Sequence, residues 1–250
     1  MLDPTGLLAA AAVALLAGFV KGAVGFAMPM IMISGLSLIL PPGQALALLI
    51  LPTLASNGYQ ALRGGLGPAR AAAAEHWRYI AISAVFILGA GQLVAVLPVA
   101  ALYLILGVPV TLFALVQLAG WRPVIPPRRR RVTELGVGAF AGFVGGLSGV
   151  WGPPLVLYLT ALETPKRMQI QVQGVIYGIG AVTLTVAHLR SGVLTSETAP
   201  WSALMLLPVA VGMALGMAVQ DRLDQRRFRQ ATLAVLIVAG ANLIRRGLTG

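Results

Sequence analysis

A thirteen-residue stretch that occurs twice constrains the fold of this chain more than any other feature. The first copy, AGFVKGAVGFAMP, spans Ala17–Pro29, and the second, AGFVGGLSGVWGP, spans Ala141–Pro153, 124 residues later. Seven of the thirteen positions are identical. Each copy is an apolar, helix-like run that breaks into glycines and then reaches a proline. In a membrane protein, apolar segments interrupted at corresponding places in two halves indicate a transport site.

The composition predicts a membrane protein. The chain is 58% hydrophobic and 10% charged, whereas soluble domains carry about 25% charged residues. Several apolar runs approach the roughly 20 residues needed to cross a bilayer. We therefore predict an all-α fold, a polytopic bundle of membrane helices in contact with the lipid bilayer and without a soluble domain.

The net charge of +11 does not indicate a nucleic-acid partner. The basic residues lie in short loops between apolar runs, where the positive-inside rule places them. The chain also has no cysteine, which excludes disulfides, thiol catalysis and thiolate metal sites.

The runs divide the chain into two similar halves, residues 1–125 and 132–250, joined by a basic linker at 121–131. In each half a broken or re-entrant first element precedes three spanning helices. The first broken element is expected as runs 6–20 and 26–40, with a stop at Lys21-Gly22, and the second as runs 134–145 and 150–162. The predicted spans are 44–62, 77–96, 99–119, 168–189, 201–219 and 228–244. Gly212 and Gly216 have the spacing of a close helix contact.

Loop charges favour one topology. If each broken element crosses the membrane once, the Lys and Arg residues outside the spans divide 11 to 6 between the two sides. If each enters and returns on the same side, they divide 14 to 3, and Lys21 alone remains in the apolar region. The larger asymmetry fits the positive-inside rule better. We therefore predict re-entrant hairpins, six crossings, both termini outside and two halves in opposite orientations, as in inverted-repeat transporters.

The glycine breaks are candidate binding elements. A broken helix leaves backbone N–H and C=O groups without intrahelical partners, and these groups must be covered by protein or line a wet cavity. A helix that restarts after the break directs its free N–H groups into that cavity, which suits an anion. Gly22, Gly25, Gly146 and Gly149 are therefore predicted site residues. Close helix packing through small residues is the alternative interpretation.

Lys21 is the only formal charge predicted inside the apolar cores, and a lysine there is costly and often functional. It would suit an anionic substrate, although its long stem could also reach water. Ser148, inside the second break, could donate to an oxyanion or bond to its own backbone. Trp151 could line the cavity or simply pack.

Uncharged polar residues in the apolar runs are further candidates, since they need partners and should face the bundle interior. The predicted cavity-lining donors are Asn57 and Gln60 in the first half and Gln173 and Tyr177 in the second, with Gln171 beside them. All seven acidic residues fall near span ends or in loops. Their position argues against a carboxylate cation site and against a buried carboxylate proton relay. His76 lies in a basic loop and receives no role. Enzyme and cofactor motifs such as HExxH, the P-loop and GxSxG are absent.

With both breaks identified, the chain resembles the sulfite exporter TauE/SafE family over nearly its whole length. Many members continue the Gly-x-x-Gly break with three glycines, whereas here the positions read Ala27-Met28-Pro29 and Trp151-Gly152-Pro153. The resemblance implies a multi-pass transporter of the inner (plasma) membrane and a small substrate anion such as sulfite, thiosulfate or an organosulfonate.

These observations predict a secondary transporter rather than an enzyme, with no cofactor and with alternating access at a midplane site between the two broken helices. A passive channel for anions or small solutes is the alternative. The specific substrate, the coupling ion, the direction of transport and the oligomeric state are not predicted.

Overall fold

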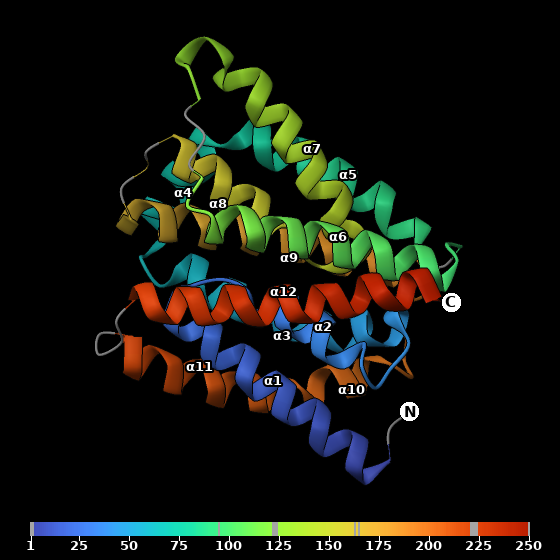
Figure 1. Cartoon of the computed structure of the whole chain (residues 1–250). Helices are drawn as coiled ribbons and strands as arrows, with labels where there is room; N and C mark the ends of the chain where they lie inside the picture. Colours follow the sequence, from blue (N-terminus) through green and yellow to red (C-terminus); the bar gives the residue numbers. More distant parts are fainter. Residues whose placement is uncertain are drawn as a thin grey trace.

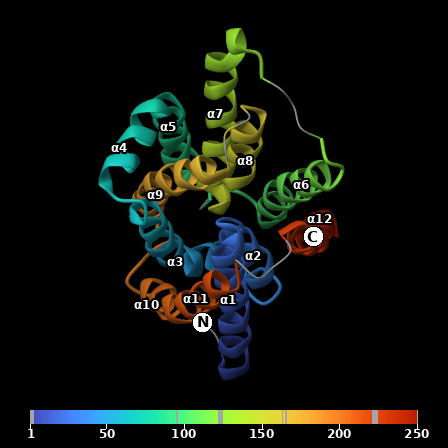
Figure 2. The same cartoon turned by 90° about the vertical axis from the view of Figure 1, so that its left-hand side faces the viewer.

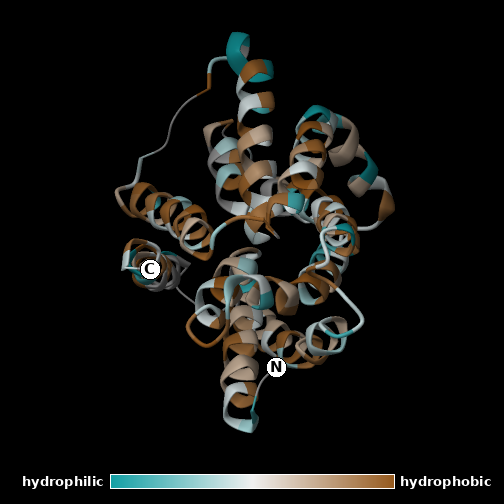
Figure 3. Cartoon of the chain, turned by 90° about the vertical axis from the view of Figure 1, so that its right-hand side faces the viewer, coloured by the Kyte–Doolittle hydropathy of each residue, from teal (hydrophilic) through white to brown (hydrophobic). Residues whose placement is uncertain are grey.

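The computed structural model describes residues 3–94, 96–121, 125–162, 164, 166–220 and 225–249. Within these residues every regular element is a helix, so the predicted all-α class is confirmed. Five of the described helices are long and apolar enough to cross a membrane. The chain is therefore a multi-pass membrane protein, and Figure 3 shows apolar residues along most of its helices.

The first broken element consists of helices α1 (Pro4–Val24) and α2 (Met28–Leu36). Helix α1 begins where the Asp3 carboxylate accepts a hydrogen bond from the Gly6 N–H at 2.8 Å, and it ends at Gly25, which has a φ of 81°. Ala27, with a φ of 76°, precedes α2. The predicted stop at Lys21-Gly22 is therefore wrong, because the helix continues through both residues and the left-handed backbone begins only at Gly25.

The second broken element consists of α7 (Arg130–Ser148) and α8 (Gly152–Ala161), after a short 3₁₀ helix, η1 (Pro127–Arg129). Gly149, with a φ of 71°, ends α7 and corresponds to Gly25 in the first copy. Glycine adopts this left-handed conformation without the steric cost that a side chain brings. The duplicated sequence thus breaks at equivalent positions in the two halves.

The remaining helices follow the predicted spans closely, with two exceptions. Helix α4 (Leu66–Glu75) lies where the sequence predicts a loop. The predicted span 201–219 is two helices, α10 (Ala199–Leu204) and α11 (Leu206–Gln220), which meet at Met205. The first half contains α3 (Pro42–Leu62), α4 (Leu66–Glu75), α5 (Trp77–Leu93) and α6 (Val99–Leu118), and the second contains α9 (Lys166–Arg190) and α12 (Gln225–Thr249).

Each broken element packs mainly against a helix of the other half: α1 against α11 and α7 against α5. The α3–α9 and α6–α12 pairs also join the two halves (Figure 2). The α1–α11 contact is very close, since a Cβ atom on Gly212 or Gly216 would lie 2.0 Å from the carbonyl oxygens of Leu15 or Phe19. The predicted small-residue contact is confirmed there.

Each broken element folds back toward the end of the molecule where it began. In Figure 1, α1 runs inward from the end that carries both termini, and α2 returns to that end. There the Arg246 guanidinium donates hydrogen bonds to the carbonyls of Ser37 and Leu38, just after α2. At the opposite end the Ile125 N–H, ahead of α7, donates to the Ala161 carbonyl at the end of α8. Both broken elements are therefore helical hairpins. Because α1 by itself is long and apolar enough to cross a membrane, the re-entrant topology stays a prediction.

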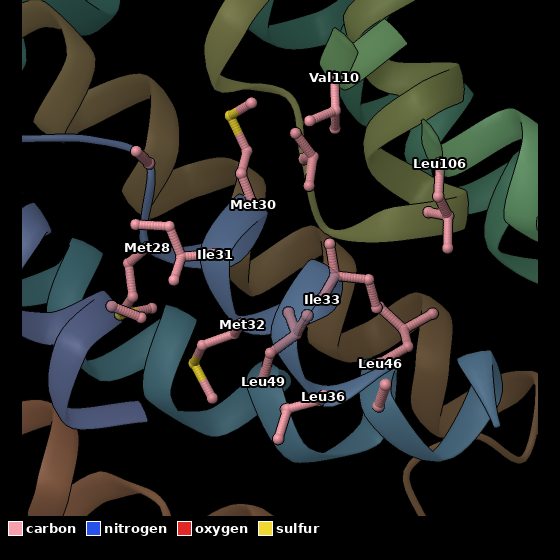
Figure 4. Packing of buried hydrophobic residues seen from close by; sticks show 14 of the residues in the cluster. Met28, Met30, Ile31, Met32, Ile33, Leu36, Leu46, Leu49, Leu106 and Val110 are labelled. Atoms are coloured by element: carbon pink, nitrogen blue, oxygen red, sulfur yellow. The ribbon is translucent and has the colours of Figure 1, made fainter. Parts of the chain in front are cut away.

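Helix α2 lies deep in the core and is apolar on all sides, as expected of a helix with no exposed face. Its side chains Met28, Met30, Met32, Ile33 and Leu36 are almost completely buried. They pack around Leu46 and Leu49 of α3 and Leu106 and Val110 of α6 (Figure 4). The flexible methionines can fill the irregular space beside a helix end.

Candidate functional site

The two helix breaks meet around one small cavity of about 20 Å³. A volume of this size holds about one water molecule. The lining comes from both breaks and from the facing helices α3 and α9. The residues are Lys21, Phe26, Ala27, Pro29, Met30, Asn57, Gly149, Val150, Trp151, Gly152 and Tyr177.

Lys21 is the charged group of this cavity, and only 2% of its surface is exposed. Its Nζ donates a hydrogen bond to Asn57 Oδ1 at 2.5 Å and lies 6.0 Å from the centre of the Tyr177 ring. Neither ion pair in the described part of the chain involves Lys21. A buried ammonium that has polar neighbours but no carboxylate is a favourable place for an anion.

Tyr177 ties α9 to the second break. Its hydroxyl donates to the Gly152 carbonyl, the first residue of α8, at 3.2 Å, while its ring faces the Lys21 ammonium. An aromatic face near an ammonium is attractive through the ring quadrupole. Tyr177 therefore joins the lysine of one half to the broken helix of the other.

Ser148 has its hydrogen-bonding capacity taken by its own backbone. The hydroxyl donates to the Val144 carbonyl at 2.6 Å and accepts from the Val150 N–H at 3.0 Å. The structure therefore shows Ser148 bonded to its own backbone, and not free to donate to an oxyanion. The serine holds the backbone of the second break, and it is not part of the cavity lining.

Gly22 and Gly146 lie inside helices, at contacts between helices. A Cβ atom on Gly22 would lie 2.2 Å from the Met213 carbonyl oxygen of α11, and one on Gly146 would lie 2.7 Å from the Ile87 carbonyl oxygen of α5. Gly22 and Gly146 therefore serve close helix packing, the alternative to a binding role. Gly25 and Gly149 form the breaks.

The glutamines lie outside the cavity lining. Gln60 is half-buried in α3, where its backbone packs against Gly174 of α9, and Gln173 is buried within α9. Gln171 lies beside Gly64. Of the predicted site residues, the structure therefore brings Lys21, Asn57, Gly149, Trp151 and Tyr177 around one cavity.

Comparison with known families agrees with this architecture. The family profile described as sulfite exporter TauE/SafE matches residues 10–243, nearly the whole chain. The chain belongs to the sulfite exporter TauE/SafE family. No curated protein and no solved structure matches it significantly. Membership indicates a membrane transporter for sulfite or a related sulfur anion, and not an enzyme.

In this TauE/SafE protein the two breaks are filled in complementary ways. The position equivalent to Lys21 is Gly145, and the position equivalent to Ala27 is Trp151. A Cβ atom on Gly145 would lie 2.9 Å from the Trp151 Cβ, so the indole occupies the space beside α7. Gly180 of α9 makes room on the other side, with its added Cβ 3.1 Å from the indole nitrogen. One half of the cavity therefore presents a lysine and the other a tryptophan.

Sequence reasoning missed the apolar part of the lining, namely Phe26, Ala27, Pro29, Met30 and Val150. All five lie in or beside the duplicated stretch, so treating every residue of both breaks as lining would have found them. Ala27 is a special case, because it adopts a left-handed φ of 76° at a position where glycine is the easier residue.

A larger hollow of about 470 Å³ lies between α6 and the α7–α8 hairpin. Its lining is apolar, with Phe113, Val116, Phe140 and Pro154 among its residues. It contains no buried charge to select a small anion, so size alone does not make it the site. Val150 lines both hollows, which places the larger one against the second break.

Proposed function

We propose that this protein is a secondary transporter of a small sulfur-containing anion, such as sulfite, thiosulfate or an organosulfonate. The anion binds beside Lys21, between the two broken helices, and alternating access moves it across the membrane. The observation that carries the proposal is the buried Lys21 ammonium in a cavity that both breaks form. Family membership supports the choice of a sulfur anion.

Three kinds of donor support an anionic substrate. The Lys21 ammonium supplies charge, and the Asn57 amide beside it supplies a polar group that can rearrange around a ligand. The start of α2 supplies backbone amides, because the first α2 hydrogen bond is made by the Ile31 N–H to the Ala27 carbonyl, and the amides before it point out of the helix. Such a helix end carries partial positive charge.

The small size of the cavity supports a carrier rather than an open pore. A space for about one water molecule is too small for a sulfur oxyanion, so binding and release require the two breaks to separate. Each hairpin is packed on a helix of the other half, α1 on α11 and α7 on α5. Movement of one hairpin away from the other, and from the helix on which it packs, opens the cavity from one end at a time, as in inverted-repeat transporters.

The test is counterflow in proteoliposomes. Vesicles loaded with unlabelled sulfite or sulfonate should take up the labelled anion in a saturable manner, faster than empty vesicles do. Linear, non-saturable uptake without stimulation by internal anion would show a passive channel and overturn the carrier proposal. A thermal-shift screen against sulfite, thiosulfate, sulfate, taurine and isethionate identifies the substrate class, because a ligand of the folded state raises the Tm.

Lys21→Met tests the binding residue. Loss of a charge-assisted hydrogen bond worth about 1.5–3 kcal/mol should weaken anion affinity about 10- to 100-fold. Lys166→Met, the same change at the only other lysine, should leave affinity unchanged. Normal affinity in Lys21→Met would remove the proposed role of Lys21.

A further inference from the structure

A second polar cluster lies where the start of α5 meets the α7–α8 hairpin, and none of its residues lines the cavity. It contains His76 between α4 and α5, Tyr79 of α5, Glu134 of α7 and Tyr158 of α8. His76 and Glu134 are each 3% exposed, and His76 Nδ1 lies 3.9 Å from Glu134 Oε1. Glu134 lies near the start of α7, as the sequence predicts, but it is buried because the first turns of α7 pack against α5.

Several polar atoms of the cluster have no hydrogen-bond partner among the described residues. They are His76 Nδ1, Glu134 Oε1 and the Tyr79 hydroxyl. A buried polar atom without a partner costs about 1–3 kcal/mol, and such atoms are rare in native proteins. The aromatic rings of the cluster pack together, with the Tyr79 and Tyr158 rings stacked at a centroid distance of 5.8 Å and the His76 ring edge-on to Tyr158 at 6.3 Å.

The charges around the pair are largely engaged with each other. Arg130 donates to Glu75 at 3.0 Å, and Arg78 lies 5.0 Å from the Trp77 ring. Burial raises the pKa of Glu134, while Arg130, Arg78 and a hydrogen bond from the Tyr79 backbone oppose that rise and Glu75 adds to it. Burial lowers the pKa of His76, with Arg130 lowering it further and Glu75 opposing them. The imidazole is therefore neutral in this state, and the Glu134 side chain remains without a directly bonded cation.

The pair joins the second hairpin to a helix that lies outside it. Glu134 and Tyr158 belong to the two arms of the hairpin, and His76 and Tyr79 to the start of α5. The α7 helix runs from Glu134 to the break at Gly149, about 22 Å at 1.5 Å per residue. A movement of this rigid helix at the cavity therefore also moves Glu134 relative to His76.

The tyrosines connect the pair with the cavity. Tyr79, Tyr158 and Tyr177 belong to one cluster of buried side chains, and Tyr177 lines the cavity beside Lys21. Packing of α5, α8 and α9 therefore connects the pair with the central cavity.

We propose that His76 and Glu134 form a proton-binding site whose occupancy holds the α7–α8 hairpin against α5, so that hairpin movement during transport is linked to release of one proton. The inference rests on the proposed transport function. In the packed state one proton on Glu134 makes the pair neutral, and a small side-chain rotation brings it within hydrogen-bond distance of His76. When the hairpin leaves α5, water reaches the pair and the carboxyl group ionises.

The linkage has a defined pH window. A hydrated Glu and His have ordinary pKa values of about 4.3 and 6.5. Above about pH 6.5 the open pair therefore holds no proton and the packed pair holds one, so a rise in pH favours opening. Below about pH 6.5 the open pair holds one proton on His76, both states carry the same number, and the pH dependence disappears.

The test is the pH profile of counterflow with a sulfonate, whose charge is constant over this range. Where hairpin opening limits exchange, the rate should be flat below about pH 6.5 and should rise above it by up to about tenfold per pH unit, the limit for one proton. Glu134→Gln should abolish the rise. His76→Asn should keep a rise but extend it to lower pH, because the imidazole no longer titrates in the open state.

His188→Gln is the matched control, since His188 is the other histidine of the chain and is also fully buried. It should leave the profile unchanged. A flat wild-type profile, or an unaltered profile in Glu134→Gln, would overturn the proton site while leaving anion transport intact. If Glu134→Gln does not fold, an unaltered profile in His76→Asn overturns the proton site in its place. Absence of any anion exchange at every pH refutes the transport function instead.

Discussion

Replacement of Gly22 by alanine separates a packing role from a binding role for the duplicated glycines. The added Cβ atom would lie 2.2 Å from the Met213 carbonyl oxygen and 2.9 Å from the Met217 nitrogen. Both atoms belong to the backbone of α11, so neither can rotate away, and α1 and α11 must move apart. Real carbon–oxygen contacts exceed 3.0 Å, which implies a separation of about 1 Å.

The expected energy follows from two opposing terms. Overpacking of this kind costs about 1–3 kcal/mol, and the backbone contact in Gly22→Ala points to the upper part of that range. The higher helix propensity of alanine returns up to about 1 kcal/mol. The net destabilisation should be about 1–2 kcal/mol, which for a chain of this size lowers the Tm by about 2–8 °C.

Gly89→Ala provides the matched control. Gly89 also lies in a helix, α5, but an added Cβ meets no atom within 4 Å. The same chemical change should therefore leave the Tm equal or higher. Both variants are measured by thermal unfolding in detergent and by counterflow. If Gly22→Ala is as stable as Gly89→Ala and yet loses transport, Gly22 acts at the substrate and the packing argument is wrong.

Three further substitutions test individual contacts. Asn57→Leu should destabilise the protein by removing the acceptor of the Lys21 ammonium, and adding Lys21→Met should restore part of the loss; a double-mutant cycle measures the coupling, which we expect to be about 1.5–3 kcal/mol. Ser148→Ala should lower the Tm, since two hydrogen bonds at the break are lost, without changing the KM for the anion; an increased KM would return Ser148 to the binding site. Arg246→Gln should remove the hydrogen bonds to the carbonyls after α2. The free energy of unfolding should fall by about 1.5–3 kcal/mol, which lowers the Tm by several degrees; an unchanged Tm would show that the guanidinium does not hold the first hairpin.

Local sequence determined the class of the fold and the existence of the breaks. Apolar run length and the scarcity of charge are properties of contiguous residues, and they are enough to predict membrane helices. Duplication of the glycine–proline pattern located both interruptions to within a few residues. Lys21 could be singled out because a charge inside an apolar run is unusual wherever the run packs.

Only the tertiary structure decided what each polar or small residue does. Gly22 and Gly25 are the same residue type in one motif, but the neighbouring α11 makes Gly22 a packing position, while the left-handed turn makes Gly25 the break. Glu134 lies near a helix start, as the sequence predicts, yet packing of α7 on α5 buries it beside His76. Asn57 reaches Lys21 and Gln60 does not line the cavity, because helix rotation in the bundle selects the face. Composition and periodicity report on a segment alone, whereas burial and pairing depend on contacts between helices that are far apart in the chain.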